Sequence, residues 1–174
     1  VQEGRPVTPE YNDSSMVEDC EVLDNVPIQI GLDFGLTPAA VFAQRDSKGV
    51  WRVIHEIVTY DMGLERFAIL LKEDINRFFP GYDIIVFGDP AGSQRSTLTE
   101  DTSFDHLKTH GIIARPCATN NFKARREALA LPMTRLIEGK PGFRVDRKCV
   151  RVRKALAGGY HFKSIAVGAG HERF

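Results

Sequence analysis

Apolar and polar residues alternate along three stretches near the start of the chain, and this pattern predicts three strands. The strands are expected over residues 28–35, 39–45 and 50–60, with a turn at 46–49 between the last two. The third strand is expected to direct four of its side chains to one face: Trp51, Val53, His55 and Ile57. Connections this short join antiparallel neighbours, so the fold is expected to begin with a three-strand meander.

Helical periodicity and apolar runs alternate in the rest of the chain. Apolar residues three and four positions apart predict a helix over 64–79, ended by Pro80 and Gly81. The run 83–89 is almost wholly apolar, which is typical of a strand buried on both faces. The remaining elements are expected in this order: a short helix over 102–110, a buried strand over 112–116, a helix over 121–139 with a kink or fresh start at Pro132, a short strand over 143–146, a helix over 148–157 and a last strand over 160–164.

The order of these elements indicates one α/β domain. Hairpins need antiparallel pairing and helical crossovers need parallel pairing, so a mixed sheet with helices on both faces is expected. This is the ribonuclease H-like arrangement. The domain is expected to occupy residues 27–174 of the 174-residue chain. The turn-rich stretch 1–26 is expected to be an arm over the domain surface or a linker to a missing neighbour, with a short helix that Ser15 caps.

The net charge is zero, but the charges are unevenly distributed. Residues 1–27 hold seven acidic residues and one basic residue, whereas residues 121–174 hold thirteen basic and four acidic residues. A basic third on a neutral protein favours a surface that binds a polyanion. Two other interpretations stay open. The cations could form a solvated helix face, or they could pair in part with the acidic arm, which would shield the surface until a polyanion displaces it.

Composition excludes several classes of protein. The hydrophobic fraction of 43% and the charged fraction of 26% are those of an ordinary globular domain. No apolar run approaches the roughly 20 residues that a membrane-spanning helix needs. Three cysteines without metal-binding spacing favour a reduced, cytoplasmic setting over a disulfide scaffold. The sequence contains neither a GxxxxGK[ST] phosphate loop nor a GxSxG nucleophile motif.

Two aspartates follow predicted strands. Asp33 lies near the end of the first strand and Asp89 ends the fourth. Ligands of open α/β sheets gather beyond the carboxyl ends of the strands, so these carboxylates converge if the two strands are neighbours. Adjacent carboxylates repel unless a hard cation lies between them, and oxygen ligands suit Mg²⁺ or Mn²⁺. Gly35 and Gly92 would let backbone approach the ligand closely. The alternative is that both aspartates are turn formers or helix caps.

Two metal ions held by clustered carboxylates can cut a phosphodiester, because one activates a water and the other stabilises the leaving oxygen. A third ligand is usually needed, and Glu56 and Asp146 are the weaker candidates for it. His106 and His110 have zinc-like spacing on a predicted helix but no third ligand nearby. Asp101 and Asp105 are expected to be acids at a helix start, where the helix dipole favours them.

Several segments resemble the nuclease domain of tailed-phage terminase large subunits. The resemblance rests on Gly31-Leu32-Asp33-Phe34-Gly35-Leu36-Thr37-Pro38-Ala39, Gly88-Asp89-Pro90-Ala91-Gly92, Thr119-Asn120-Asn121 with Arg125, and Gly158-Gly159-Tyr160. The arm contributes Gly4-Arg5-Pro6-Val7 and Tyr11-Asn12-Asp13, so the similarity covers most of the chain.

The resemblance implies an endonuclease that cuts concatemeric double-stranded viral DNA during genome packaging with two Mg²⁺ or Mn²⁺ ions. Asp33 is then the first metal ligand and Asp89 the second. The family's third acid lies in a segment resembling Ser-His-x-x-Asp-Ala-Leu, which these 174 residues lack and which is expected beyond Phe174. We expect Lys123, Arg125 and Arg126 to contact the DNA backbone. Contacts of this kind do not distinguish one base sequence from another.

The resemblance also implies partners. Family members carry an N-terminal ATPase domain, which this chain lacks and to which the arm would connect. A portal ring and a small terminase subunit are further expected partners. The expected location is the host cell cytoplasm rather than the mature virion, with no membrane involved.

Two alternatives to the nuclease stay open. One is a non-catalytic DNA-holding module of a packaging motor, in which Asp33 and Asp89 are structural. The other is an actin-like phosphate-transfer module, because Asp-Phe-Gly-x-Thr at residues 33–37 resembles the phosphate loop of that superfamily. Length argues against the latter, since two such domains would be needed to enclose ATP.

Overall fold

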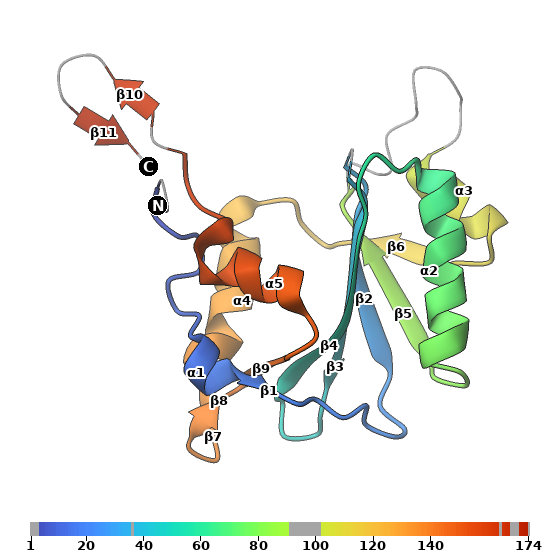
Figure 1. The fold of residues 1–174 in the computed structure, drawn as a ribbon, viewed down its shortest axis with the longest axis horizontal. Helices are drawn as coiled ribbons and strands as arrows, with labels where there is room; N and C mark the ends of the chain where they lie inside the picture. Colours follow the sequence, from blue (N-terminus) through green and yellow to red (C-terminus); the bar gives the residue numbers. More distant parts are fainter. Residues whose placement is uncertain (1–3, 36, 91–101, 164, 168–170, 174) are drawn as a thin grey trace.

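A seven-stranded mixed sheet forms the centre of the molecule (Figure 1). The structure is a computed structural model, and it describes residues 4–35, 37–90, 102–163, 165–167 and 171–173. The order of strands in the sheet is β1-β9-β4-β3-β2-β5-β6. Their bounds are β1 (Val17–Glu18), β2 (Ile28–Asp33), β3 (Ala39–Arg45), β4 (Trp51–Val58), β5 (Ile84–Gly88), β6 (Ala114–Pro116) and β9 (Phe143–Asp146).

The pairing of these strands confirms the predicted mixed sheet. β2, β3 and β4 form the antiparallel meander. β5 pairs in parallel with β2, and β6 with β5. On the other side β9 pairs in parallel with β4, and β1 with β9. Because β2, β4, β5, β6 and β9 all run in one direction, their carboxyl ends point to the same edge of the sheet.

Helices cover both faces of the sheet, as predicted. α2 (Leu64–Phe78) and α3 (Ser103–Thr109) lie on one face, and α4 (Phe122–Thr134) and α5 (Val150–Lys154) lie on the other (Figure 1). The buried stripe of α2 includes Phe67, Ala68 and Leu71, all fully buried against the first face. A second cluster, which includes Met133 and Val145, fills the space under α4 and α5. The sheet is thus buried on both sides, as its apolar strands require.

A bulge in β4 corrects the predicted alternation. His55 pairs with Phe42, but Val53 pairs with Ala43, so Ile54 is an extra residue in the ladder. Because of this extra residue, each side chain after the bulge lies on the opposite face of the sheet from the one that simple alternation predicts. Val53 packs under α4 and α5, whereas His55 contacts Asp74 of α2 at 2.8 Å. The expectation that Trp51, Val53, His55 and Ile57 share a face is therefore wrong.

The other corrections concern the ends of elements. The strand expected at 112–116 is the short edge strand β6, which is half exposed rather than buried. α4 ends at Thr134, two residues after Pro132, and a hairpin of β7 (Leu136–Ile137) and β8 (Lys140–Pro141) replaces its last turn. Glu138 and Gly139 have φ of 53° and 79°, which is the geometry of a two-residue hairpin turn.

The last strand, expected at 160–164, is not formed over residues 160–163, and residue 164 lies outside the described residues. In its place are a single bridge between Pro6 and His161 and a separate hairpin of β10 (Ile165–Val167) and β11 (His171–Arg173). α5 continues into a π-helical turn over Ala155–Gly159, in which Gly158 has a φ of 116°. This conformation suits glycine and explains why the helix ends at this point.

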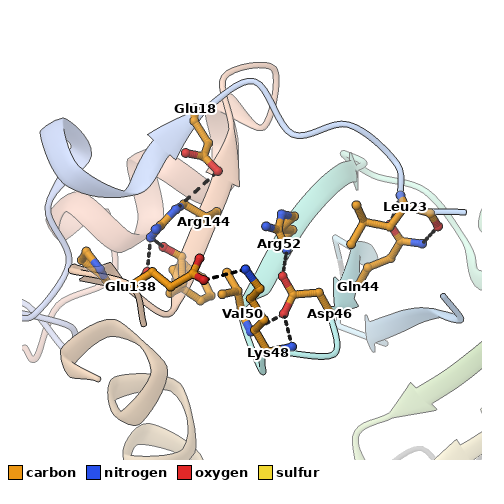
Figure 2. A network of polar contacts seen from close by, with 11 residues as sticks. Glu18, Leu23, Gln44, Asp46, Lys48, Val50, Arg52, Glu138 and Arg144 are labelled. Carbon is orange, nitrogen blue, oxygen red and sulfur yellow. Dashed lines mark hydrogen bonds and ion pairs between the residues drawn. The ribbon is translucent and has the colours of Figure 1, made fainter. Parts of the chain in front are cut away.

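The N-terminal segment 4–26 lies along the domain and adds to its core. Its short helix α1 (Asp13–Met16) is capped by Asn12, not by Ser15, and leads into the edge strand β1. Buried Gln44 of β3 binds both backbone groups of Leu23 at 2.8 and 2.9 Å (Figure 2). These bonds satisfy a buried amide and hold the chain just before β2.

Candidate functional site

The register of β2 and β5 brings Asp33 and Asp89 together. Leu32 pairs with Gly88 in a parallel ladder, and each aspartate is the next residue along its strand. Neighbouring strands are about 4.8 Å apart, so the two aspartates occupy adjacent strand ends at the carboxyl edge of the sheet. The condition under which the two carboxylates converge, that these strands are neighbours, is met.

Both aspartates belong to the face that α4 and α5 cover. Leu32 packs in the core on the α2 side, so Asp33, the next residue, has its side chain on the opposite side. A Cβ atom added at Gly88 would meet the rings of Phe34 and Phe104, on the α3 side. Asp89 then points the other way, toward α4, where Arg125 contacts it.

Asp33 is exposed, and its carboxylate is fixed locally. Its Oδ1 atom accepts a hydrogen bond from the backbone N–H of Gly35 at 3.1 Å. This turn leads the chain away from the carboxylate and leaves it facing solvent. Gly92, the second glycine expected beside the ligand, lies outside the described residues.

Phe34 packs against the strand ends that carry the two aspartates, on the α3 side of the sheet. Its ring lies across Gly88 and makes an edge-to-face contact with Phe104, with ring centroids 5.3 Å apart. The absence of a side chain at Gly88 is what lets the ring approach the backbone of β5 so closely. The residue beside Asp33 is therefore packed against the strand that carries Asp89.

Arg125 of α4 forms an ion pair with Asp89. Its Nη1 atom lies 3.6 Å from Oδ2 of Asp89 and 2.9 Å from Oδ1 of Asn120. Asn121 caps α4 by accepting a hydrogen bond from the N–H of Ala124 at 3.0 Å. The cap fixes the first turn of α4, from which Arg125 reaches the sheet.

The other two predicted DNA contacts have different surroundings. The side chain of Lys123 is 84% exposed, and its Nζ atom lies 4.0 Å from Oε1 of Glu127 on the same helix. The guanidinium of Arg126 binds Glu10 and the carbonyl oxygen of Val7, so it holds the N-terminal segment against α4. The role of all three as DNA contacts stays a prediction.

Glu56 and Asp146 have structural roles away from the aspartate pair. Glu56 accepts hydrogen bonds from the backbone N–H groups of Arg151 and Val152, at 2.9 and 2.7 Å, and so caps α5. Asp146 is 2% exposed and accepts bonds from the N–H groups of Cys20 and Lys148. Neither residue is therefore positioned in this structure as a third ligand beside Asp33 and Asp89.

The remaining polar candidates belong to α3. Asp105 accepts from Thr102 and forms a capping box with it, so it is an acid at the helix start, as expected. That hydrogen bonding holds the pKa of Asp105 below its usual value. His106 and His110 lie in and just after the last turns of this helix, and Asp101 lies outside the described residues.

Acidic residues of the N-terminal segment pair with cations of the basic third. Four such ion pairs join the two regions: Glu10–Arg126, Asp13–Arg153, Glu18–Arg144 and Asp19–Arg147. Figure 2 shows the Glu18–Arg144 pair, which lies where β1 adds to the sheet. The interpretation that the arm neutralises part of the basic third is confirmed, and the surface charge left over is smaller than the sequence suggests.

The donor set fits a hard divalent cation. Two carboxylates at adjacent strand ends, one of them exposed, supply the oxygen ligands that Mg²⁺ and Mn²⁺ prefer. Across the described ranges, no group of three or more histidine, cysteine, aspartate or glutamate residues could hold a metal ion. Two carboxylates alone are fewer ligands than a complete site needs, so the pair could hold only part of the coordination shell of such an ion.

Solved structures share this fold. The P22 large terminase nuclease domain matches with a TM-score of 0.71 and 15% identity, over 94% of this chain and 82% of that chain. The large terminase from a thermophilic bacteriophage matches with a TM-score of 0.68 and 12% identity, over 90% of this chain and 38% of that chain. The large terminase nuclease from the thermophilic phage G20c matches with a TM-score of 0.58 and 15% identity, over 97% and 87% of the two chains.

These likenesses confirm the predicted ribonuclease H-like fold, here in the form found in phage large terminase nuclease domains. The match covers a little over a third of the second of these structures, the large terminase of a thermophilic bacteriophage. No family model and no curated protein sequence matches the chain. In the part of the chain that the structure describes, no helix is long and apolar enough to cross a membrane.

Proposed function

We propose that the chain is the nuclease module of a phage DNA-packaging terminase and cuts double-stranded viral DNA with bound divalent cations. One observation carries the proposal. The parallel register of β2 and β5 places Asp33 and Asp89 on adjacent strand ends, in a fold whose solved examples are terminase nucleases. Neither the fold nor the pair of carboxylates would be a sufficient argument without the other.

In this proposal Asp33 and Asp89 hold Mg²⁺ or Mn²⁺, two ions in the full site. Such ions lower the pKa of a bound water and stabilise charge on the leaving oxygen of a phosphodiester. The chain's own contribution is to fix the carboxylates. The Gly35 N–H orients Asp33, and the packing of Phe34 on Gly88 keeps the ends of β2 and β5 in register.

Arg125 and Lys123 contact the DNA backbone in this proposal. Arg125 lies beside Asp89 and is oriented by Asn120, so its guanidinium can donate to the oxygens of a phosphate that reaches the carboxylate pair. Lys123 is exposed in the same first turn of α4. Arg126 is a weaker candidate, because its Nε and Nη2 groups already bind Val7 and Glu10.

The wider proposal follows the same resemblance. A third carboxylate from a segment after Phe174 would complete the site, and residues 1–26 would connect the module to an ATPase domain. A portal ring and a small terminase subunit are proposed as the other partners, in the cytoplasm of the infected host.

The test is the conversion of supercoiled plasmid to nicked and linear forms with Mn²⁺, Mg²⁺ or EDTA. The variants are Asp33→Asn and Asp89→Asn, and the control is Asp83→Asn. Asp83 is exposed and precedes β5, so it lies at the opposite end of the strand that Asp89 follows. All four proteins are also prepared in a longer form that carries the acidic segment expected after Phe174.

The proposal expects metal-dependent cutting that both site variants lose and that Asp83→Asn keeps. Cutting by the longer form alone would place the third carboxylate after Phe174. If no form cuts with any metal while duplex DNA still binds, the nuclease is excluded and the DNA-holding module replaces it.

A further inference from the structure

A cation and an aromatic ring form an exposed pair beyond the site described above. Tyr60 follows β4 at the carboxyl edge of the sheet, and its residue surface is 62% exposed. The guanidinium carbon of Arg151, on α5, lies 5.5 Å from the centroid of the Tyr60 ring. A ring in this position attracts and orients the guanidinium, but it leaves the positive charge in place.

The backbone at Arg151 is fixed by a contact from the sheet. Its N–H donates to Glu56 of β4 at 2.9 Å, and the N–H of Val152 donates to the other oxygen of the same carboxylate. A cation with a fixed backbone and an oriented head group loses little conformational freedom when it binds an anion. The pair is therefore prepared for a ligand rather than for packing.

Arg151 also differs from three of the cations around it. Arg147, Lys148 and Arg153 each have a carboxylate partner, in Asp19, Asp146 and Asp13 respectively. Within the described part of the chain, the side chain of Arg151 forms no ion pair, and neither does that of Lys154 on the same helix. The carboxylate of Glu56 binds the backbone N–H of Arg151 rather than its guanidinium. The N-terminal segment thus pairs with several cations of the basic third but not with Arg151 or Lys154.

The position of the pair relative to the aspartates follows from the register. Asp33 pairs with Ala39, and Ala39 pairs with Val58, so the ends of β2 and β4 are level. Two strand spacings separate them, a distance of about 10 Å. Arg151 contacts Tyr60, just after β4, and Arg125 contacts Asp89, just after β5. Since β2 lies between β4 and β5 in the sheet, the two arginines flank the carboxylate pair from opposite sides.

We propose that Arg151, oriented by Tyr60, binds a backbone phosphate of the DNA whose scissile phosphate reaches the carboxylate pair. The duplex then crosses the carboxyl edge of the sheet from α4 to α5. This inference rests on the proposed function and defines the path of its substrate. A polyanion is the fitting ligand because the cation continues a charged face that already includes Arg125.

The test measures binding of a fluorescent 30-base-pair duplex to the 174-residue chain in EDTA, over a series of salt concentrations. The variants are Arg151→Ala and Arg151→Lys. The control is Arg77→Ala, because Arg77 lies 5.1 Å from the ring centroid of Phe78 in a pair of the same kind on α2, on the other face of the sheet. Circular dichroism and thermal unfolding check that each variant folds.

Loss of one phosphate contact reduces the slope of log K against log salt by about 0.9, which corresponds to about eightfold weaker binding at 0.1 M salt. We expect this change in Arg151→Ala only, because Arg151→Lys keeps the charge and Arg77 lies off the path. Equal slopes for Arg151→Ala and the unchanged chain would overturn the inference. If the longer form of the chain cuts plasmid while the slopes are equal, only the path is wrong; if neither form binds duplex DNA or cuts plasmid, the proposed function fails as well.

Discussion

The guanidinium of Arg125 lies 3.6 Å from a carboxylate oxygen of Asp89, at the position where the site would hold a metal ion. A fixed positive charge here has two effects. It reduces the repulsion between the two carboxylates, and it repels a divalent cation that binds to them. In the proposed nuclease, Arg125 would therefore compete with the metal ion for Asp89 until a phosphate supplies negative charge to both.

The first prediction concerns this competition. We expect Arg125→Ala to bind Mn²⁺ several-fold more tightly in the absence of DNA, because the competing charge is removed. We also expect it to cut DNA at least tenfold more slowly, because one charged donor to the phosphate is lost. Calorimetric titration with Mn²⁺ and the plasmid assay measure the two effects.

Lys123→Ala is the control for Arg125→Ala. Lys123 lies on the same turn of α4 and contacts Glu127 rather than an aspartate of the site. Its removal should leave the affinity for Mn²⁺ unchanged. Tighter Mn²⁺ binding in both variants would indicate a general effect of net charge, and unchanged binding in Arg125→Ala would contradict the competition.

A second prediction concerns the support beneath the carboxylates. A Cβ atom at position 88 would lie 2.5 and 2.6 Å from two atoms of the Phe34 ring, which is too close for carbon atoms. We expect Gly88→Ala to lower the free energy of unfolding by about 1–3 kcal/mol, as overpacking does. Displacement of Phe34 also shifts Asp33, so metal-dependent cutting should fall. Urea unfolding and the plasmid assay measure these changes.

Gly31→Ala tests whether the effect is specific to position 88. Gly31 lies on β2, and a Cβ atom there would meet nothing within 4 Å. The variant should lose less than about 1 kcal/mol of stability. Replacing Phe34 by leucine in the Gly88→Ala background should recover part of the lost stability, and no recovery would mean that the ring is not the obstacle.

The central pair of the site was predictable because its determinants are local. Asp33 and Asp89 each end a strand with a clear pattern, and the rule that parallel strands end at one edge brings them together. The antiparallel meander and α2 were predictable for the same reason. Periodicity within each segment decides both the element and the face that it buries.

The contacts around the pair were not predictable, because they join distant parts of the chain. Glu56 caps a helix about 95 positions later, and Tyr60 meets Arg151 across a similar separation. The bulge at Ile54 has no local signal, although it reverses the face on which Glu56 lies. Asn120 and Arg125 are five residues apart at the start of a predicted helix, which is compatible with the hydrogen bond between them. That spacing does not indicate that the side chain of Arg125 also contacts Asp89.

A third prediction tests the cap that holds α5 on β4. Glu56 accepts two backbone N–H groups with its two oxygens, and a glutamine can accept only one of them without placing an amide donor against the other. We expect Glu56→Gln to lower the free energy of unfolding by about 1–3 kcal/mol, measured in urea. Glu21→Gln, at an exposed position, should change it by less than about 0.5 kcal/mol. Equal effects of the two variants would contradict the role of the cap.

A fourth prediction follows from the environments of the three thiols. Cys117 is exposed, whereas Cys20 and Cys149 are buried. Burial is the main cause that raises the pKa of both buried thiols to about 12; the lesser causes are the carboxylates of Asp146 and Glu18 for Cys20 and of Glu56 and Asp146 for Cys149. Since the thiolate is the form that reacts with a disulfide reagent, and since burial blocks access, one thiol of three should react quickly at pH 8.

The sign of the pH effect follows from the raised pKa. Folding keeps the two buried thiols neutral, so their contribution to stability is complete below about pH 9 and declines as the pH rises toward 12.

Cys117→Ser should show no fast thiol at pH 8, because the other two thiols are buried, and all remaining thiols should react after denaturation. Thermal unfolding of this variant should occur at lower temperature as the pH rises above about 9. A second fast thiol at pH 8 would mean that the interface of the N-terminal segment, which contains Cys20, opens in the native state.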